Sequence, residues 1–470
     1  MATRRRRALP LAAAALLACA AQVGTSRAAH AATQLSVTST ADAPDAHPGD
    51  GTCATASGAC TLRAALEEAS AQSAPVAIAL PAGTYAISGN PVQVNGSVTL
   101  SGAGADTTTV QVTGARGFEV SGGALTLSNL TLTGSSTAKA GGAVLNAVDA
   151  SVTLSGCVVS GAVADGDGGA LLASGGSLTL DHTQLHDDVG QSGGALFAVR
   201  TAVTMASSTF DSDTATADGG AVFLSDPAGF SISDTSFTSD TANDRGGALY
   251  VEGLTGSAAT PESIASSTFK GDTAFDSGGA LYVGGTSNGV EPASLAISKS
   301  TFSGDTAGRG GALATAGGVV GVDGSTFSGN RSATSDGGAL AGTGTISVRG
   351  SSFDHNSSDG SGGAIWAAGS ADIRSSSFTA NSAGTLGGAL ALTGEPAPTV
   401  QSVRYSANSA QDGDADVWRQ GSPLAAAAAG QAASSTSRPP LALAIAAGAG
   451  ALLLVLVAAM VVRRRRRRPA

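Results

Sequence analysis

The sequence contains few aromatic, sulphur-containing or charged residues. Aromatic residues make up 4% of its 470 residues and charged residues 13%, with three methionines and four cysteines. This composition argues against a bulky globular core. The two tryptophans, Trp366 and Trp418, are too few for a sugar-stacking cleft. What the chain does have is 66 glycines and 42% hydrophobic residues, which suits thin, repetitive strands.

Basic residues are scarce outside the two ends of the chain. Five arginines lie in the first 31 residues and six in Arg463–Arg468, which leaves 14 basic residues against 35 acidic ones. The rest of the chain therefore carries a net charge near −21. Such an acidic body disfavours nucleic acid as a partner and favours solubility at a surface or attraction of cations.

The first 31 residues have the pattern of a secretory signal peptide. Four arginines precede the apolar stretch Ala8–Ala21, and Ala29-His30-Ala31 offers a small-x-small cleavage site. Two alternatives remain open. Leu16-Leu-Ala-Cys19 fits a lipoprotein box, and the arginine run fits the twin-arginine route.

The other end of the chain predicts a membrane anchor. Leu441–Val462 contains no charged residue and is long enough to span a bilayer as a helix. The basic tail 463–470 follows directly, so the positive-inside bias places it in the cytoplasm and the body outside. Residues 420–440, rich in Ala, Ser, Gly and Pro, are expected to form a flexible linker.

A repeat organises most of the sequence. Successive copies of Gly-Gly-Ala are 25 to 32 residues apart. From Leu180 onward, an apolar-x-apolar pair between them ends five residues before a Phe, or before Leu185 in the first case. An Asp or Asn comes three residues after that Phe, as in Phe327-Ser-Gly-Asn330. The Gly-Gly-Ala copies begin at residues 141, 168, 193, 219, 246, 278, 310, 337, 362 and 387.

This period predicts a stacked solenoid, because no single unit of that length can bury its own apolar face. The alternating apolar residues indicate strands, so residues 76–419 are expected to form a parallel β-helix with two or three short strands per coil. The Phe residues would then form an internal ladder and the paired glycines would form corners. The longer repeats are interpreted as loop insertions at Leu254–Glu262 and Gly284–Pro292.

The Gly-Gly-Ala-Leu and Phe-x-x-Asn motifs resemble the repeat of the polymorphic outer membrane protein family. That family belongs to the broader pectin-lyase-like class, so the resemblance implies a right-handed parallel β-helix. The chain departs from the motif in four consecutive coils, which have Asp in place of Asn, and no autotransporter barrel follows. These residues are Asp213, Asp240, Asp272 and Asp305.

Residues 32–75 are expected to cap the solenoid. Cys53 and Cys60 suggest a small disulfide loop in an exported chain, the alternative being two unpaired thiols. Cys157 has no remaining partner and is assigned to a strand as a small buried residue. The apolar spacing within Thr61–Ala71 predicts a short amphipathic helix. Together with Asp-Gly-Thr-Cys53, the segment Cys60-Thr-Leu-Arg-Ala-Ala resembles the CSLREA domain, which implies an N-terminal cap of a secreted β-helix.

Few residues are candidates for chemistry, and we predict no catalytic, cofactor or metal residue. The closest carboxylate pairs are Asp165 with Asp167 and Asp187 with Asp188, but recurrence at one coil position is typical of structural turns. His182 and His186 flank the second pair in a strand region, where a solvated turn is favoured over a metal site. The aspartates at 412, 414 and 416 resemble half of a calcium loop without its terminal Glu.

The row of four aspartates has two interpretations. In the favoured interpretation, each carboxylate caps its own turn and points toward water. Alternatively, divalent cations bridge the row, so calcium is left open as a ligand.

These patterns predict a cell-surface-anchored, non-enzymatic β-helix protein that acts as an adhesin or a cell-envelope stalk. It would have an extracellular body, a single membrane helix, and a polysaccharide or another surface ligand as its partner. The alternatives are a polysaccharide lyase or hydrolase of the same fold and a purely structural spacer.

Overall fold

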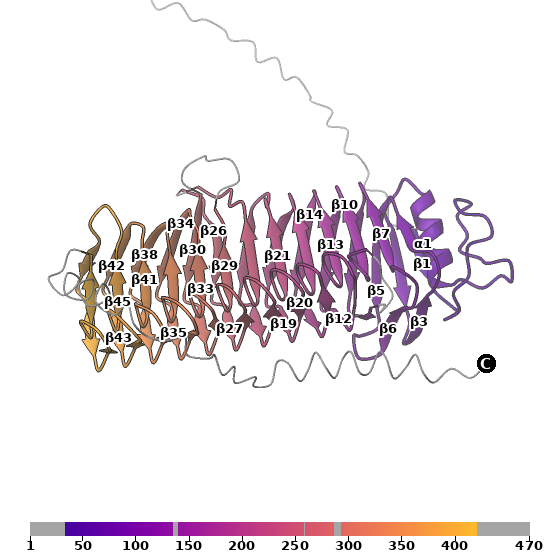
Figure 1. The fold of residues 1–470 in the computed structure, drawn as a ribbon. Helices are drawn as coiled ribbons and strands as arrows, with labels where there is room; N and C mark the ends of the chain where they lie inside the picture. Colours follow the sequence, from indigo (N-terminus) through magenta and orange to yellow (C-terminus); the bar gives the residue numbers. More distant parts are fainter. Residues whose placement is uncertain (1–32, 135–139, 258, 286–292, 421–470) are drawn as a thin grey trace, which may run out of the picture. The chain divides into compact units, whose positions relative to one another are not determined.

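The computed structural model describes residues 33–134, 140–257, 259–285 and 293–420 (Figure 1). The predicted signal peptide 1–31, all but the first residue of the linker 420–440, the predicted membrane helix 441–462 and the basic tail 463–470 lie outside these residues. Within the described part, no helix combines the length and the apolar character needed to cross a bilayer.

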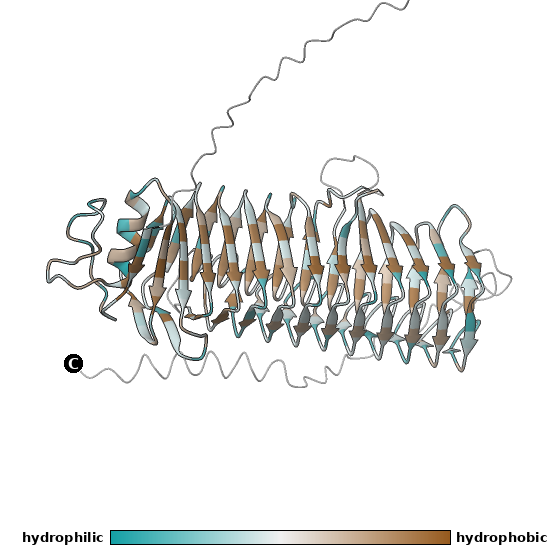
Figure 2. Ribbon diagram, turned by 180° about the vertical axis from the view of Figure 1, so that it is seen from behind, coloured by the Kyte–Doolittle hydropathy of each residue, from teal (hydrophilic) through white to brown (hydrophobic). Residues whose placement is uncertain are grey.

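The chain divides into two units, Met1–Thr209 and Phe210–Ala470. Both are built from coils whose strands pair in parallel with the strands of the next coil, so the fold is an all-β parallel solenoid of the right-handed type. Along the strands, hydrophobic and hydrophilic residues alternate (Figure 2). After each Gly-Gly-Ala from residue 168 onward, the chain passes in turn through four sheets, which we number 1 to 4. The sequence predicted two or three strands per coil; the structure adds a fourth, only two residues long.

Sheet 1 directly follows Gly-Gly-Ala. In the first unit it contains β4 (Val92–Val94), β7 (Phe118–Ser121), β10 (Leu145–Val148), β13 (Leu171–Ser174) and β17 (Leu196–Val199). In the second unit it contains β21 (Val222–Ser225), β25 (Leu249–Glu252), β29 (Leu281–Val283), β33 (Leu313–Thr315), β37 (Leu340–Gly342), β41 (Ile365–Ala367), β45 (Leu390–Leu392) and β49 (Val417–Arg419).

Sheet 2 carries the apolar-x-apolar pairs. Its strands in the first unit are β1 (Thr33–Ser36), β2 (Val76–Leu80), β5 (Ser97–Gly102), β8 (Ala124–Ser128), β11 (Ser151–Ser155), β14 (Ser177–Asp181) and β18 (Ala202–Ala206). Those in the second are β22 (Phe230–Ser233), β26 (Glu262–Ala265), β30 (Ser294–Ser298), β34 (Val319–Asp323), β38 (Thr345–Arg349), β42 (Ala371–Arg374) and β46 (Thr399–Gln401).

Sheet 3 carries the Phe residues. Its strands in the first unit are β3 (Gly83–Ile87), β6 (Thr108–Val112), β9 (Thr131–Thr133), β12 (Val158–Ser160) and β15 (Gln184–His186). It continues with β19 (Thr209–Asp211), β23 (Ser236–Thr238), β27 (Thr268–Lys270), β31 (Thr301–Ser303), β35 (Thr326–Ser328), β39 (Ser352–Asp354), β43 (Ser377–Thr379) and β47 (Arg404–Ser406).

Sheet 4 consists of the two-residue strands. In the first unit it has β16 (Val189–Gly190). In the second it has β20 (Thr214–Ala215), β24 (Thr241–Ala242), β28 (Thr273–Ala274), β32 (Thr306–Ala307), β36 (Arg331–Ser332), β40 (Ser357–Ser358), β44 (Ser382–Ala383) and β48 (Ser409–Ala410).

The paired glycines form the corner before sheet 1, as the sequence predicts. In the copies from residue 168 onward, the first glycine adopts a left-handed conformation, for example φ 64° at Gly246, which an L-residue rarely takes. The second approaches the next coil so closely that a Cβ on Gly247 would collide with the carbonyl oxygen of Gly279. Each glycine of the pair is therefore required for a different reason.

The predicted Phe ladder is confirmed in the second unit. Successive rings are stacked with centroids 4.7 to 4.9 Å apart and planes within 6° of parallel, and all of them are fully buried. The ladder comprises Phe210, Phe237, Phe269, Phe302, Phe327, Phe353 and Phe378.

The corner after sheet 3 corrects one interpretation of the aspartate row. Asp213, Asp240, Asp272 and Asp305 do not splay toward water but are buried, with 0% of each residue exposed. The residue before each of them turns the chain inward with a positive φ, as at Ser239 with φ 59°. The carboxylates of Asp240, Asp272 and Asp305 then accept a hydrogen bond from the backbone N–H of the equivalent residue in the previous coil.

The corner between sheets 2 and 3 holds a further ladder, which the sequence analysis did not identify. In the second unit, buried serine hydroxyls accept hydrogen bonds from backbone N–H groups of the preceding coil, as Ser300 does from Ser267 at 3.2 Å. Cys157 occupies the same corner between β11 and β12. It is buried as expected, but the prediction that it lies in a strand is wrong.

The N-terminal segment forms a cap on the first unit. Helix α1 (Leu62–Ala71) begins at Thr61, whose hydroxyl accepts from the N–H of Ala64, and it packs against β2, β4 and β5. A disulfide joins Cys53 and Cys60, with Cα atoms 5.1 Å apart. Buried Glu68 accepts hydrogen bonds from the backbone N–H groups of Gly49 and Gly51, which ties the loop to the helix.

Truncation of one ladder ring should destabilise the solenoid locally. Phe327→Ala removes a ring stacked on both sides, and we expect a cost of about 3–5 kcal/mol. Because solenoid contacts join nearest neighbours, hydrogen-exchange protection should fall first in the adjacent coils. Phe275→Ala serves as the control, since that side chain is 82% exposed. Equal loss of protection along the whole second unit would contradict the ladder's role.

Candidate functional site

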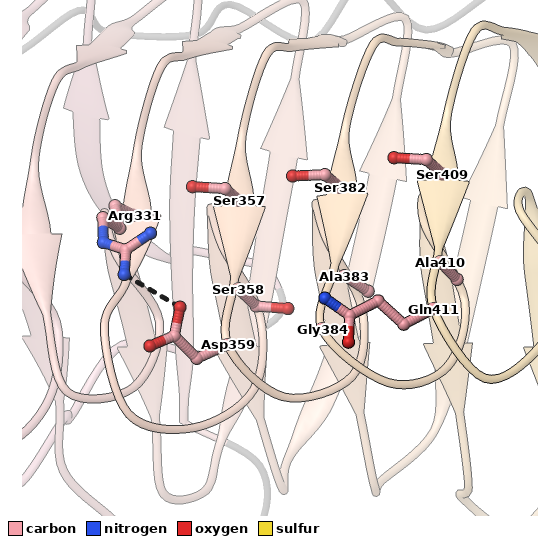
Figure 3. Close-up of a pocket in the computed structure, with 10 residues that line it drawn as sticks. All are labelled: Arg331, Ser357, Ser358, Asp359, Ser382, Ala383, Gly384, Ser409, Ala410 and Gln411. Atoms are coloured by element: carbon pink, nitrogen blue, oxygen red, sulfur yellow. Dashed lines mark hydrogen bonds and ion pairs between the residues drawn. The ribbon is translucent and has the colours of Figure 1, made fainter.

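The outer face of sheet 4 in the second unit carries a polar groove of about 430 Å³ (Figure 3). It spans four neighbouring two-residue strands, β36, β40, β44 and β48, and the turns that follow the last three of them. Its lining combines serine hydroxyls with an arginine, an aspartate and a glutamine. The residues are Arg331, Ser357, Ser358, Asp359, Ser382, Ala383, Gly384, Ser409, Ala410 and Gln411.

The position of these side chains follows from the geometry of sheet 4. In each two-residue strand the first residue points outward and the second inward, so Ser357 and Ser382 face the groove whereas Ser358 and Ala383 are buried. Strand register pairs Arg331, Ser357, Ser382 and Ser409 in one row. Neighbouring hydroxyls therefore repeat at the strand spacing of ~4.7–4.9 Å.

One end of the groove is charged. The guanidinium Nη2 of Arg331 lies 2.8 Å from Oδ1 of Asp359, and both side chains are about half exposed. The pair leaves further N–H groups of the guanidinium free to bind a ligand, since arginine carries five donors. The groove thus offers donors and acceptors to a ligand rich in hydroxyl groups.

The outer face of sheet 1 has aromatic residues held by arginines. The Arg245 guanidinium lies 5.1 Å from the Tyr250 ring and 5.0 Å from that of Tyr282, and also pairs with Asp218 at 3.1 Å. Burial raises the pKa of the Tyr250 phenol. Because this cluster is internally paired and partly buried, we regard it as structural.

Trp366 lies on the same face, two strands beyond Ala314. The guanidinium of Arg309 is 4.3 Å from its ring centroid, which gives a planar cation above an aromatic face. Tyr250, Tyr282 and Trp366 thus each pack against an arginine guanidinium.

The two carboxylate pairs singled out in the sequence, Asp165 with Asp167 and Asp187 with Asp188, do not form one cluster. Asp188 is buried and accepts from the N–H of Ala162, whereas Asp187 is exposed at the corner and pairs with His186 at 2.9 Å. Asp167 accepts from the backbone N–H of Ser192. These contacts are those of turn residues, as the sequence analysis favoured.

His182 lies in the corner between β14 and β15, whereas His186 is the last residue of β15. His182 pairs with Asp181 at 2.8 Å, and His186 pairs with Asp187, so each has its own neighbour as a partner. Within the described ranges, no group of three or more His, Cys, Asp or Glu side chains could hold a metal ion. That statement covers the cluster at 412, 414 and 416, where Asp416 accepts from the Asn408 amide, and the aspartate row.

The groove was not predicted, although the sequence contains a signal for it. Asp-Thr-Ala recurs at 213–215, 240–242, 272–274 and 305–307, and the outward residue of each is a hydroxyl. In later coils the same place is taken by Arg331 and then by serines. Recognising the two-residue strand would have aligned these residues in one row.

The family comparison matches one coil. Residues 350–368 match the model of the Chlamydia polymorphic membrane protein repeat, which confirms the resemblance for that segment. No curated protein matches the chain.

Among solved structures, the catalytic domain of a GH87 alpha-1,3-glucanase in complex with tetrasaccharides has a TM-score of 0.46 and 14% identity, over 77% of this chain and 68% of that one. The A-module of the Azotobacter vinelandii mannuronan C-5 epimerase AlgE4 has a TM-score of 0.42 and 17% identity, over 77% and 95%. The catalytic domain of Agl-KA has a TM-score of 0.35 and 12% identity, over 83% and 69%. At these values the likeness says nothing about activity.

The charge pair at the groove should contribute little to folding. Arg331 and Asp359 are about half exposed, and exposed pairs contribute about 0–1 kcal/mol. We therefore expect the free energy of unfolding of Arg331→Gln, measured by chemical denaturation, to lie within about 1 kcal/mol of that of the unchanged protein. Arg245→Gln, which breaks a less exposed pair and two ring contacts, should cost more. An equal loss in both variants would show that Arg331 is structural.

Proposed function

We propose that this protein is a cell-surface-anchored, non-enzymatic β-solenoid that binds saccharide chains along the groove of sheet 4. The observation that supports it is the row of outward hydroxyls in strand register, with Arg331, Asp359 and Gln411 in the same lining. A repeating row of donors and acceptors suits a repeating, hydroxyl-rich ligand. A polymer lying along the row would meet the same hydrogen-bonding group at each coil.

The negative net charge of the protein favours a neutral saccharide over an anionic one as the ligand. The body carries a net charge near −21, which repels an anionic polymer, and the single arginine of the groove is already paired with Asp359. A neutral chain meets no such repulsion. It can also hydrogen-bond to carboxylate, guanidinium, amide and hydroxyl groups alike.

A binding role is favoured over catalysis by where the recurrent carboxylates lie. Asp240, Asp272 and Asp305 are buried in the interior and bonded to backbone groups, so a polysaccharide outside cannot reach them. Acid–base cleavage of a glycosidic bond needs two carboxyl groups that flank the substrate. A polysaccharide lyase or hydrolase remains the second candidate, and a spacer without ligand the third.

Export and anchoring complete the proposal. The disulfide between Cys53 and Cys60 fits an oxidising compartment. A signal peptide at 1–31, a CSLREA-like cap at 32–75 and a membrane helix at 441–462 would place the body outside the cell, tethered through 420–440.

Filling the groove should abolish saccharide binding. Ser382→Tyr places a ring in the middle of the row, and we expect the full-length protein to lose retention on immobilised neutral polysaccharide without a change in its unfolding midpoint. Thr379→Tyr, an exposed position on sheet 3 of the same coil, is the matched control and should bind normally. Release of new reducing ends by the unchanged protein would instead support the enzyme. Absence of retention on every neutral polysaccharide would support the spacer.

The proposed topology predicts a specific proteolytic product. Protease added to intact cells should cut within 420–440 and release the body as a soluble fragment, because that segment would lie outside the membrane. The basic tail should stay with the cells. Recovery of the intact body in the cytosol would refute surface anchoring.

A further inference from the structure

One interior row of the second unit contains both acids and amides in equivalent positions. Asp213, Asp240, Asp272 and Asp305 are followed by Asn330, Asn356, Asn381 and Asn408, one residue from each coil. In every case from Asp240 onward, the Oδ1 atom accepts from the backbone N–H of the row member in the coil before, at 2.9 to 3.1 Å. At Oδ1, an aspartate and an asparagine therefore accept the same hydrogen bond.

The second polar atom distinguishes the two residue types. The Nδ2 of Asn330 donates to the carbonyl of Phe302 at 3.1 Å and to Oδ1 of Asn356 at 2.9 Å. Asn356 and Asn381 repeat both bonds. In the equivalent position Asp240, Asp272 and Asp305 have Oδ2, which is buried and has no hydrogen-bond partner among the described residues.

An ionised carboxylate does not fit this environment. It can only accept hydrogen bonds, and the equivalent site is one where a side chain must donate to a carbonyl oxygen. A buried carboxylate whose second oxygen accepts no hydrogen bond is strongly unfavourable when ionised. A protonated carboxyl has one O–H donor, which can replace one of the two bonds of the asparagine amide.

We propose that Asp240, Asp272 and Asp305 are neutral carboxylic acids in the folded protein, and that this proton-holding row makes its coils lose stability as the pH rises, whereas the asparagine coils are unaffected. The row would thus act as a pH-sensitive segment within the solenoid.

The surrounding charges reinforce this protonation. Burial raises the pKa of Asp240 and of Asp305 well above the usual range and that of Asp272 to about 7. The neighbouring charge of Asp272 raises the pKa of Asp240 and Asp305 further, and Asp211 on β19 acts on Asp240 in the same direction. Asp213 is the adjacent member of the row. The residues at the start of β24, β28 and β32 are uncharged threonines, and Lys270 at the end of β27 is exposed, on the outer side of its strand.

The direction of the pH effect follows from linkage. An unfolded aspartate has a pKa near ~3.9, so these groups bind more protons in the folded state than in the unfolded state above that pH. Stability is therefore fully present below about pH 4 and falls as the pH rises through the raised pKa values of the folded state, which for Asp272 is about 7. Each retained proton changes the unfolding equilibrium by at most about tenfold per pH unit.

The test compares the full-length protein with the variant Asp240→Asn, Asp272→Asn, Asp305→Asn. We expect the midpoint of thermal unfolding of the unchanged protein to fall between about pH 5 and pH 8, and the variant to lose that fall. The matched control is Asp244→Asn, Asp276→Asn, Asp323→Asn, three exposed positions with the same change in charge, which should keep the dependence. Hydrogen exchange at rising pH, corrected for the intrinsic rate, should loosen β24, β28 and β32 before β40 and β44.

Two further measurements make the proposal falsifiable even if the triple variant does not fold. The infrared spectrum at neutral pH should contain the carbonyl band of protonated carboxyl groups, and its absence would overturn the proposal. Asn330→Asp, which extends the acid row by one coil, should steepen the fall in midpoint with pH. A midpoint that falls on chelation of calcium and does not depend on pH would instead show cation-bridged carboxylates. The same pH dependence in the triple variant as in the unchanged protein would also refute the proposal.

Discussion

The solenoid depends on one constraint: the backbone N–H and C=O groups of each coil must align with those of the next coil at a constant strand spacing. The corner before sheet 1 shows how tight this is. The N–H of Gly247 donates to the carbonyl of Gly278, and a side chain on Gly247 would collide with the following coil. Because that corner admits no Cβ, Gly-Gly recurs and fixes the register of every strand in the coil. The side-chain ladders follow from that register.

Stacking in register makes each interior residue the neighbour of its own equivalents. This is favourable for Phe302, whose flat ring contacts Phe269 and Phe327 at the same distance on both sides. It is favourable for Asn356, whose side-chain amide can both donate to and accept from the equivalent residues of the neighbouring coils. For aspartate the same arrangement places like acids together, and neutral carboxyl groups relieve the conflict. The interior therefore selects side chains that are compatible with copies of themselves.

Much of this architecture could be predicted from the sequence, because a period repeated many times averages out local ambiguity. The Phe row, the Asn330 row and the helix Leu62–Ala71 were accessible in this way. The direction of a side chain at a corner was not. The direction of such a side chain depends on a positive φ at the preceding residue. At Ser239 and His355, the residue type does not predict that conformation. The burial of Asp240 was therefore predicted wrongly.

The groove was missed for a related reason. Sheet 4 has strands of only two residues, too short for alternation to reveal, and its outward side varies from Thr306 to Arg331 to Ser357 without affecting the stack. Interior positions must hold side chains that can stack on equivalent side chains of the neighbouring coils. Only outward-facing residues can therefore differ freely between coils. Chemistry specific to this protein should thus be sought where the repeat is broken on the outside. Arg331 replaces the threonine of the preceding coil there, with Asp359 beside it.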